Sequence, residues 1–105
     1  MAIYHNISGQ LTQELLAVGE KVRVLAISMA NVNASISCLV DVYIEKKLTG
    51  KFYIVKNVEL PVGATLVFEG NEINFNNNPG QFGLFIKLTK VGSGSGEPAV
   101  DVIIS

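Results

Sequence analysis

The sequence predicts an all-β domain, an antiparallel β-sandwich of seven to nine short strands. Apolar residues recur at every second position in several runs, turn-forming residues separate these runs about every ten residues, and no convincing helix lies between them. Parallel strands need long crossover connections, so the pattern favours antiparallel pairing. Immunoglobulin-like and jelly-roll topologies both fit, and a closed barrel is the alternative architecture.

The pattern of the first twenty residues fits more than one structure. Residues 3–7 predict a short strand that ends at Ser8-Gly9. The apolar residues of segment 11–18 also suit a helix of about two turns. No run of strong helix formers extends this segment, so a strand is favoured. An extended N-terminal arm over residues 1–20 is a further alternative.

The middle of the chain predicts three strands. Residues 22–31 are almost entirely apolar, which is typical of a central strand covered on both faces. Residues 35–45 alternate, with Ile36, Cys38, Val40, Val42 and Ile44 on the face that fills a core. A hairpin turn at residues 46–50 joins this strand to the next, at residues 51–59.

The last part of the chain predicts four further strands between clear turns. Leu-Pro-Val-Gly at residues 60–63 and Asn-Asn-Asn-Pro-Gly at residues 76–80 are turn signals. Two short strands, 65–68 and 72–75, are expected to flank residues 69–71. The final two strands are expected at residues 81–91 and 99–104. Their inward residues are Phe82, Leu84, Ile86 and Leu88, then Val100, Val102 and Ile104.

Composition indicates one domain, residues 1–105, with an unusually uncharged surface. Charged residues make up only 16% of the chain, whereas about 25% is ordinary. A surface with few charges suits burial against other protein. The formal net charge of −1 gives no electrostatic basis for binding nucleic acid or an anionic membrane. Lys46, Lys47 and Lys51 form one basic cluster, interpreted as a solvated hairpin tip.

The residues predict no enzyme, no cofactor and no metal site. His5 is the single histidine and no Ser-His-Asp or Cys-His pattern accompanies it, so it is interpreted as a surface residue. Cys38 is the single cysteine, which excludes an intrachain disulfide and suggests a small buried hydrophobe. Glu69, Glu72 and Asp101 do not follow a calcium-loop pattern.

The candidate interface lies on the second face of the central strands. Leu39 and Tyr43 point away from the core face of their strand, and Tyr53, Val55 and Phe85 are expected beside them. If exposed, these five residues would form an apolar patch that monomers avoid. Ordinary packing inside the domain is the alternative. Tyr43 and Tyr53 are also the candidate platform for a sugar ring.

The N-terminus lacks the basic and apolar regions of a signal peptide, and no apolar run is long enough to cross a membrane. We therefore expect a protein made and used inside a cell, or released from it by lysis.

Three segments resemble small, single-domain virion proteins of tailed bacteriophages, especially those of aquatic bacteria. They are Ala30-Asn31 at the end of an apolar strand, residues 52–66 with the turn Val-Glu-Leu-Pro-Val-Gly-Ala-Thr-Leu, and the last strand, residues 99–105, with Val-Asp-Val. The resemblance covers residues 22–105. It implies a β-sandwich assembled into a virus particle, and it implies no catalytic residues.

The resemblance implies a structural role on the virion, most of all as a capsid decoration (cement) protein. The implied partners are the major capsid protein or other virion proteins, and sister copies in a homo-oligomer. Assembly would take place in the host cytoplasm. A neck, tail or fibre-attachment component is the alternative placement, and a carbohydrate-binding β-sandwich module is the alternative from another functional class.

Overall fold

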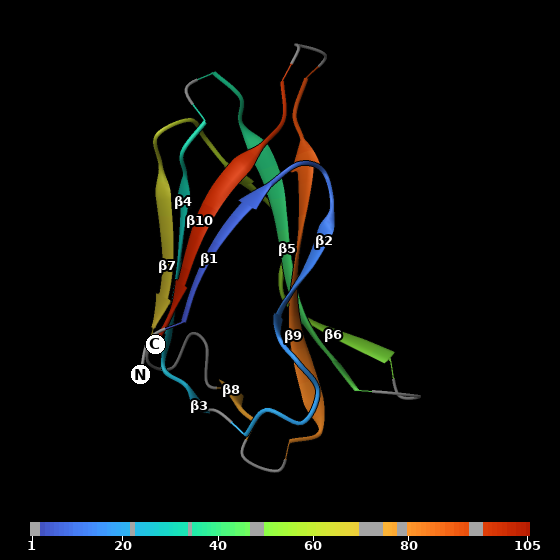
Figure 1. Cartoon of the computed structure of the whole chain (residues 1–105). Coiled ribbons are helices and arrows are strands. Elements are labelled where there is room, and N and C mark those ends of the chain that lie inside the picture. Colours follow the sequence, from blue (N-terminus) through green and yellow to red (C-terminus); the bar gives the residue numbers. More distant parts are fainter. Residues whose placement is uncertain are drawn as a thin grey trace.

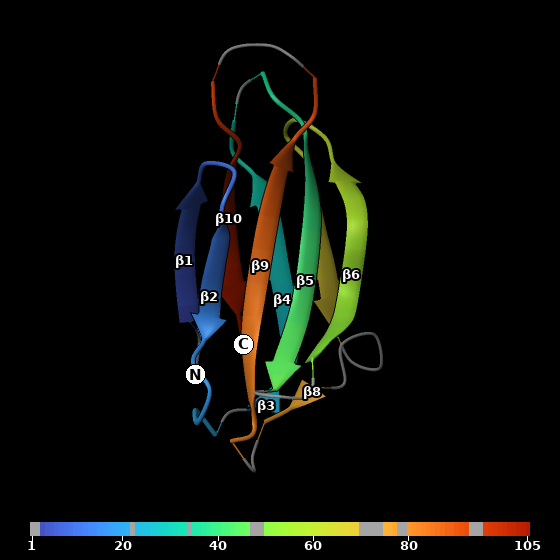
Figure 2. The same cartoon turned by 90° about the vertical axis from the view of Figure 1, so that its right-hand side faces the viewer.

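The computed structural model describes residues 3–21, 23–33, 35–46, 50–69, 75–77, 80–92 and 96–105. The predicted all-β sandwich is confirmed: two four-stranded antiparallel sheets pack face to face (Figures 1 and 2). The domain measures 42 × 27 × 20 Å. Its smallest dimension suits two sheets packed about 10 Å apart, with side chains on both outer faces.

Each sheet takes strands from both halves of the chain. Sheet A has the order β1 (Ile3–Ser8), β10 (Ala99–Ile104), β4 (Ala26–Asn31) and β7 (Thr65–Glu69). Sheet B has the order β2 (Thr12–Leu16), β9 (Phe82–Lys90), β5 (Cys38–Lys46) and β6 (Gly50–Leu60). Two short strands, β3 (Arg23–Val24) and β8 (Phe75–Asn76), pair with each other.

The strand order identifies the sandwich as a jelly roll. The pairs β5–β6, β4–β7, β3–β8, β2–β9 and β1–β10 are nested one outside the next, like a single long hairpin folded over on itself. In Figure 1 the blue strand β1 accordingly lies beside the red strand β10. The ladders β10–β4 and β5–β9 then join neighbouring turns of this folded ribbon into two sheets. This arrangement is the double-sheet jelly roll and excludes the immunoglobulin-like alternative.

The core lies between the sheets and is made by alternate residues of each strand. The expected inward residues of the last two long strands are confirmed, since Leu84, Ile86, Leu88, Val100, Val102 and Ile104 are at most 1% exposed. Val40 and Val42 of β5 are also fully buried, and they lie beside Leu88 and Ile86 of β9 in the same sheet. Burying a side chain of this size contributes about 1.5–3 kcal/mol, so this shared apolar layer holds the two sheets together.

Three expectations about the strands need correction. The segment 22–31 is interrupted at Leu25, so its first part pairs with β8 and only the second part joins sheet A. Strand β4 is central but is not covered on both faces, because Ala26, Ser28 and Ala30 are half-buried while the residues between them are buried. The described part of the expected strand 72–75 pairs with β3 rather than with β7. The segment 11–18 contains a strand, β2, as favoured over the helix.

Two buried asparagines organise the connections at opposite ends of the sandwich. Asn31, at the end of β4, donates from Nδ2 to the carbonyls of Ile36 and Leu60, at 2.9 and 3.0 Å. Asn77 follows β8, which Figure 1 shows at the lower end, and donates to the carbonyls of Glu20 and Phe82, both at 2.7 Å. Each side chain therefore ties a loop carbonyl, of Ile36 or Glu20, to the end residue of a strand.

Candidate interaction surfaces

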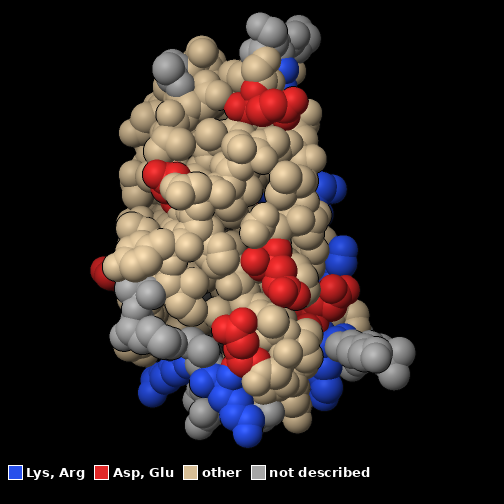
Figure 3. Space-filling view, viewed as in Figure 1, with Lys and Arg blue, Asp and Glu red and all other residues tan. Residues whose placement is uncertain are grey.

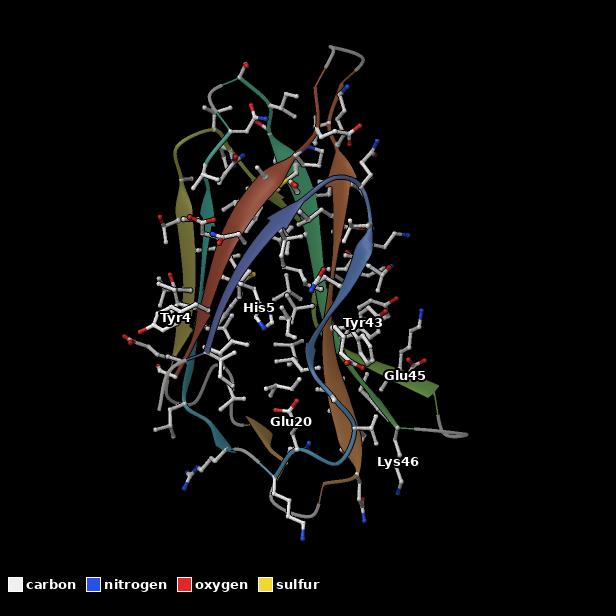
Figure 4. All side chains as sticks on the ribbon, in the orientation of Figure 1. Tyr4, His5, Glu20, Tyr43, Glu45 and Lys46 are labelled. Atoms are coloured by element: carbon white, nitrogen blue, oxygen red, sulfur yellow. The ribbon has the colours of Figure 1, made fainter. Side chains whose placement is uncertain are left out.

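His5 is not a free surface residue. It lies on the inner side of β1, and its Nε2 is 3.1 Å from the backbone carbonyl oxygen of Leu15 in β2 (Figure 4). The ladder between β2 and β9 shifts register between Glu14 and Leu16, so Leu15 sits at an irregular point of its strand. The imidazole therefore links the two sheets along their β1–β2 edge.

The other chemistry-bearing residues do not gather into a site. In the part of the chain that the structure describes, no group of three or more His, Cys, Asp or Glu side chains could share a metal ion. Cys38 is fully buried, as expected, and desolvation raises the pKa of its thiol above 9.0. None of the described residues forms a helix that could span a bilayer. The candidate sites for binding a partner are therefore the outer surfaces of the two sheets.

The outer side of sheet B carries a row of aromatic rings, which we call the aromatic face. It comprises Leu39, Tyr43, Tyr53 and Phe85. Tyr43 stands opposite both Tyr53 and Phe85 in the ladders of sheet B. Its ring centroid is 5.3 Å from that of Tyr53 and 5.5 Å from that of Phe85, on which it stacks at 17°. Four of the five predicted interface residues are therefore on one face.

Lysine side chains cover much of this aromatic row. The Nζ atoms of Lys51 and Lys56 lie 4.8 and 4.5 Å from the ring centroids of Tyr43 and Tyr53, within the range of cation–π attraction. Tyr43 lies on the central strand between the rings of Tyr53 and Phe85 and is only 5% exposed, whereas Tyr53 lies on the edge strand and is 45% exposed. Other side chains of the same domain cover Tyr43, so the part of the aromatic face that a partner could contact is smaller than the sequence predicted.

Val55 is the predicted interface residue that the structure places elsewhere. It pairs with Val42, packs into the core and is 4% exposed. Strict alternation would put it on the same side as Tyr53. The register of β6 shifts between these two positions, with Ile54 as the extra residue, and this β-bulge turns Val55 inward.

The outer side of sheet A is a second surface, which the sequence reasoning missed and which we call the neutral face. The ladder registers set Tyr4, Ile103, Ser28 and Val67 side by side across all four strands. Tyr4 is 71% exposed, Ile103 44% and Val67 45%. Ile103 and Val67 belong to strands whose inward positions are already apolar, and an apolar residue on the opposite side of such a strand is the signal that could have located them.

The neutral face contains little charge. The four strands of sheet A include no lysine or arginine. Their acidic residues are Glu69, at the end of β7, and Asp101, which accepts a hydrogen bond from Asn6 at 2.7 Å. In Figure 3 the blue lysine and arginine atoms lie at the lower end of the molecule and along the side of sheet B. The two outer faces therefore differ in charge as well as in aromatic content.

No protein-family model and no curated protein matches this sequence. The fold is similar to a chain in the crystal structure of the T13 IBDV viral particle, with a TM-score of 0.51 and 17% identity over 99% of this chain. A chain in the structure of the infectious bursal disease virus Gt strain gives a TM-score of 0.47 and 16% identity, also over 99%. This chain spans 30% and 32% of the length of those two chains. The similarity shows a shared fold.

Proposed function

We propose that this chain is a structural component of a virus particle, a decoration protein on the head of a tailed bacteriophage. The observation that carries the proposal is the jelly roll, shared along 99% of the chain with a chain of the T13 IBDV viral particle. The three sequence segments that resemble phage virion proteins favour the same class. Jelly rolls also occur in lectins and cupins, so the fold alone does not distinguish a virion role from these functions. The properties of the two outer faces are the further support.

The surfaces suit permanent burial against protein. The neutral face offers Tyr4, Val67 and Ile103 with no basic residue on its strands, so few charges lose hydration when it is covered. On a symmetric shell each contact is repeated many times, and binding to the assembled state stabilises that state by mass action.

The proposed partners are the major capsid protein, sister copies, or both, with assembly in the host cytoplasm. A neck, tail or fibre-attachment position would use the same kind of surface. Binding to isolated heads separates the two placements, because a tail component would bind tails and leave heads bare.

The test is co-sedimentation of the purified protein with heads that lack it, followed by thermal unfolding of the heads. We expect saturable, stoichiometric binding and a higher head unfolding temperature. Val67→Lys and Tyr53→Lys each place a charge on one of the two faces. Val62→Lys is the matched control, since Val62 lies in a turn and is 43% exposed, close to the 45% of the other two.

Loss of head binding in one face variant, with Val62→Lys unchanged, would identify the docking face. A protein that ignores heads and tails at micromolar concentration would overturn the proposal.

A carbohydrate-binding module is the second candidate, because Tyr53, one of the two candidate platform residues, is 45% exposed. The lysines over Tyr43 and Tyr53 occupy ring faces that a sugar would need, and this makes the candidate weaker. Glycan binding by the isolated protein that is lost in Tyr53→Ala would favour it over the virion role.

A further inference from the structure

Strand β1 is an open sheet edge with none of the usual protection. Sheet A ends at β1, so one side of this strand has no partner strand among the described residues. Its sequence, Ile-Tyr-His-Asn-Ile-Ser, contains no acidic or basic residue apart from the histidine, and no proline. Its register with β10 runs unbroken from Ile3 to Ser8. Figure 2 shows β1 outermost at this edge, beyond β2.

The other three edges of the two four-stranded sheets are protected in ways that oppose pairing. Strand β2 carries Glu14 and a register shift. Strand β6 carries Lys51, Lys56 and Glu59 and shifts register twice. Strand β7 is short and ends in Glu69. Among the edges of the two four-stranded sheets, β1 is therefore the one suited to accept another strand.

The hydrogen bonds around β1 show which of its backbone groups point outward. The amide of Gly9 donates to the carbonyl of Pro98, and Ser105 and Ala26 exchange two backbone hydrogen bonds on the other side of β10. Hydrogen-bonding direction alternates along an antiparallel strand. Both observations show that the backbone N–H and C=O groups of Ile3, His5 and Ile7 point toward β10. Those of Tyr4, Asn6 and Ser8 therefore face the open edge.

We propose that β1 pairs with β1 of a second copy of this chain, antiparallel, about a two-fold axis that passes beside Asn6. This register sets Asn6 opposite Asn6 and Tyr4 opposite Ser8, so every outward backbone donor and acceptor of these three residues gains a partner. The two copies of sheet A then form one continuous eight-stranded sheet, four strands from each. The inference does not depend on the virion role.

The strand is complementary to itself, which is why the proposed occupant is a second copy. It has no Lys, Arg, Asp or Glu, so no like charges would repel each other where the two copies of the strand meet at the axis. The large, exposed side chain of Tyr4 falls opposite the small side chain of Ser8, and on the inner side His5 falls opposite Ile7. The neutral face also continues across the junction without introducing a basic residue.

The test is register-specific cross-linking of the full chain under mild oxidation. In the proposed register the two Asn6 Cα atoms are about 5.5 Å apart, a distance that a disulfide spans. The two Tyr4 Cα atoms are about 13 Å apart along the strands, too far for a disulfide. We expect a covalent dimer from Asn6→Cys and none from the matched control Tyr4→Cys. Cys38 is fully buried and does not compete.

A second experiment compares variants at Asn6 that change the open edge of β1 and keep its ladder with β10. Asn6→Pro deletes an outward N–H that β10 does not use, and proline is tolerated on edge strands in this position. Asn6→Ala keeps that N–H and removes only the side-chain hydrogen bond to Asp101. Sedimentation equilibrium should show a dimer for the wild type and Asn6→Ala, and at least about tenfold weaker association for Asn6→Pro.

A wild-type protein that stays monomeric at high concentration, together with no cross-link in Asn6→Cys, would overturn the inference. Equal cross-linking of Asn6→Cys and Tyr4→Cys would overturn the register. A dimer that Asn6→Pro leaves intact would place the interface elsewhere. Dimerisation without head binding would leave this inference standing while the proposed function fails.

Discussion

The carboxylate of Asp41, on the central strand β5, accepts a hydrogen bond of 2.6 Å from the backbone amide of Asn57 on the edge strand β6. The amide belongs to a β-bulge, because β6 has two residues between Val55 and Val58 where β5 has only Asp41. Asp41 is 6% exposed, and Lys56 Nζ lies 3.7 Å from its other oxygen. A side chain of one strand thus stabilises an irregularity in its neighbour.

We expect Asp41→Ala to lower the free energy of unfolding by about 1.5–3 kcal/mol, because it removes a buried, charged acceptor from the partly buried amide of Asn57. Lys56→Ala should cost less than about 1 kcal/mol, since Lys56 is largely exposed and its ion pair is weak. Urea denaturation measures both. Equal losses in the two variants would mean that the ion pair, and not the amide hydrogen bond, carries the stabilisation.

Asn57 has a φ of +53°, and it is the one non-glycine residue with positive φ in the described chain. Asparagine tolerates this conformation, whereas a β-branched residue does so at a cost of about 1–2 kcal/mol. We expect Asn57→Val to lose that amount of stability and Asn57→Gly to lose less or none. Thermal unfolding of the two variants provides the measurement, and a Gly variant as unstable as the Val variant would contradict the conformational explanation.

Asn77 is 1% exposed and makes three hydrogen bonds to backbone groups of Glu20 and Phe82. Asn77→Ala should lower the free energy of unfolding by about 2 kcal/mol, because it removes three hydrogen bonds and leaves partly buried backbone groups without partners. Asn6→Ala is the matched control, since it removes one exposed hydrogen bond and should cost about 1 kcal/mol or less. Similar losses would show that water replaces Asn77 as a partner.

Burial raises the pKa of Cys38 above 9.0, and this gives stability a dependence on alkaline pH. As pH rises through 9.0 the unfolded chain loses the thiol proton first while the folded chain retains it. Stability from this group is therefore complete below pH 9.0 and falls above it, by at most about 1.4 kcal/mol per pH unit. Denaturation at pH 8 and pH 10 should show a smaller decrease for Cys38→Ala than for the wild type.

The sequence predicted the strands better than it predicted their faces or partners. The inward residues Leu84 and Val102 were identified because alternation within one strand is a local signal. The jelly roll could not be chosen over the immunoglobulin-like topology, since the pairing of Ile3 with Ile104 leaves no mark in either local segment. Val55 was assigned to the wrong face because the bulge that turns it depends on a contact between two strands.

For the candidate interface too, local patterns were predicted and contacts between strands were not. Tyr43 was identified as a residue that needs cover, and the structure provides that cover from Lys51 and Phe85. A period-two pattern specifies a side of a sheet and does not say which long side chains will fold over it. The role of the aromatic face in binding stays a prediction, and the neutral face joins it as a candidate.

The nested order of the strand pairs also bears on how the chain folds. Once the β5–β6 hairpin has closed, each outer pair joins segments that the inner pair has already brought near one another. The entropy of loop closure is then lost in small steps, even for the meeting of Ile3 and Ile104 at the two ends of the chain. We infer a zipper-like route in which the terminal ladder forms last, so Val42→Ala should slow folding while Val100→Ala mainly speeds unfolding.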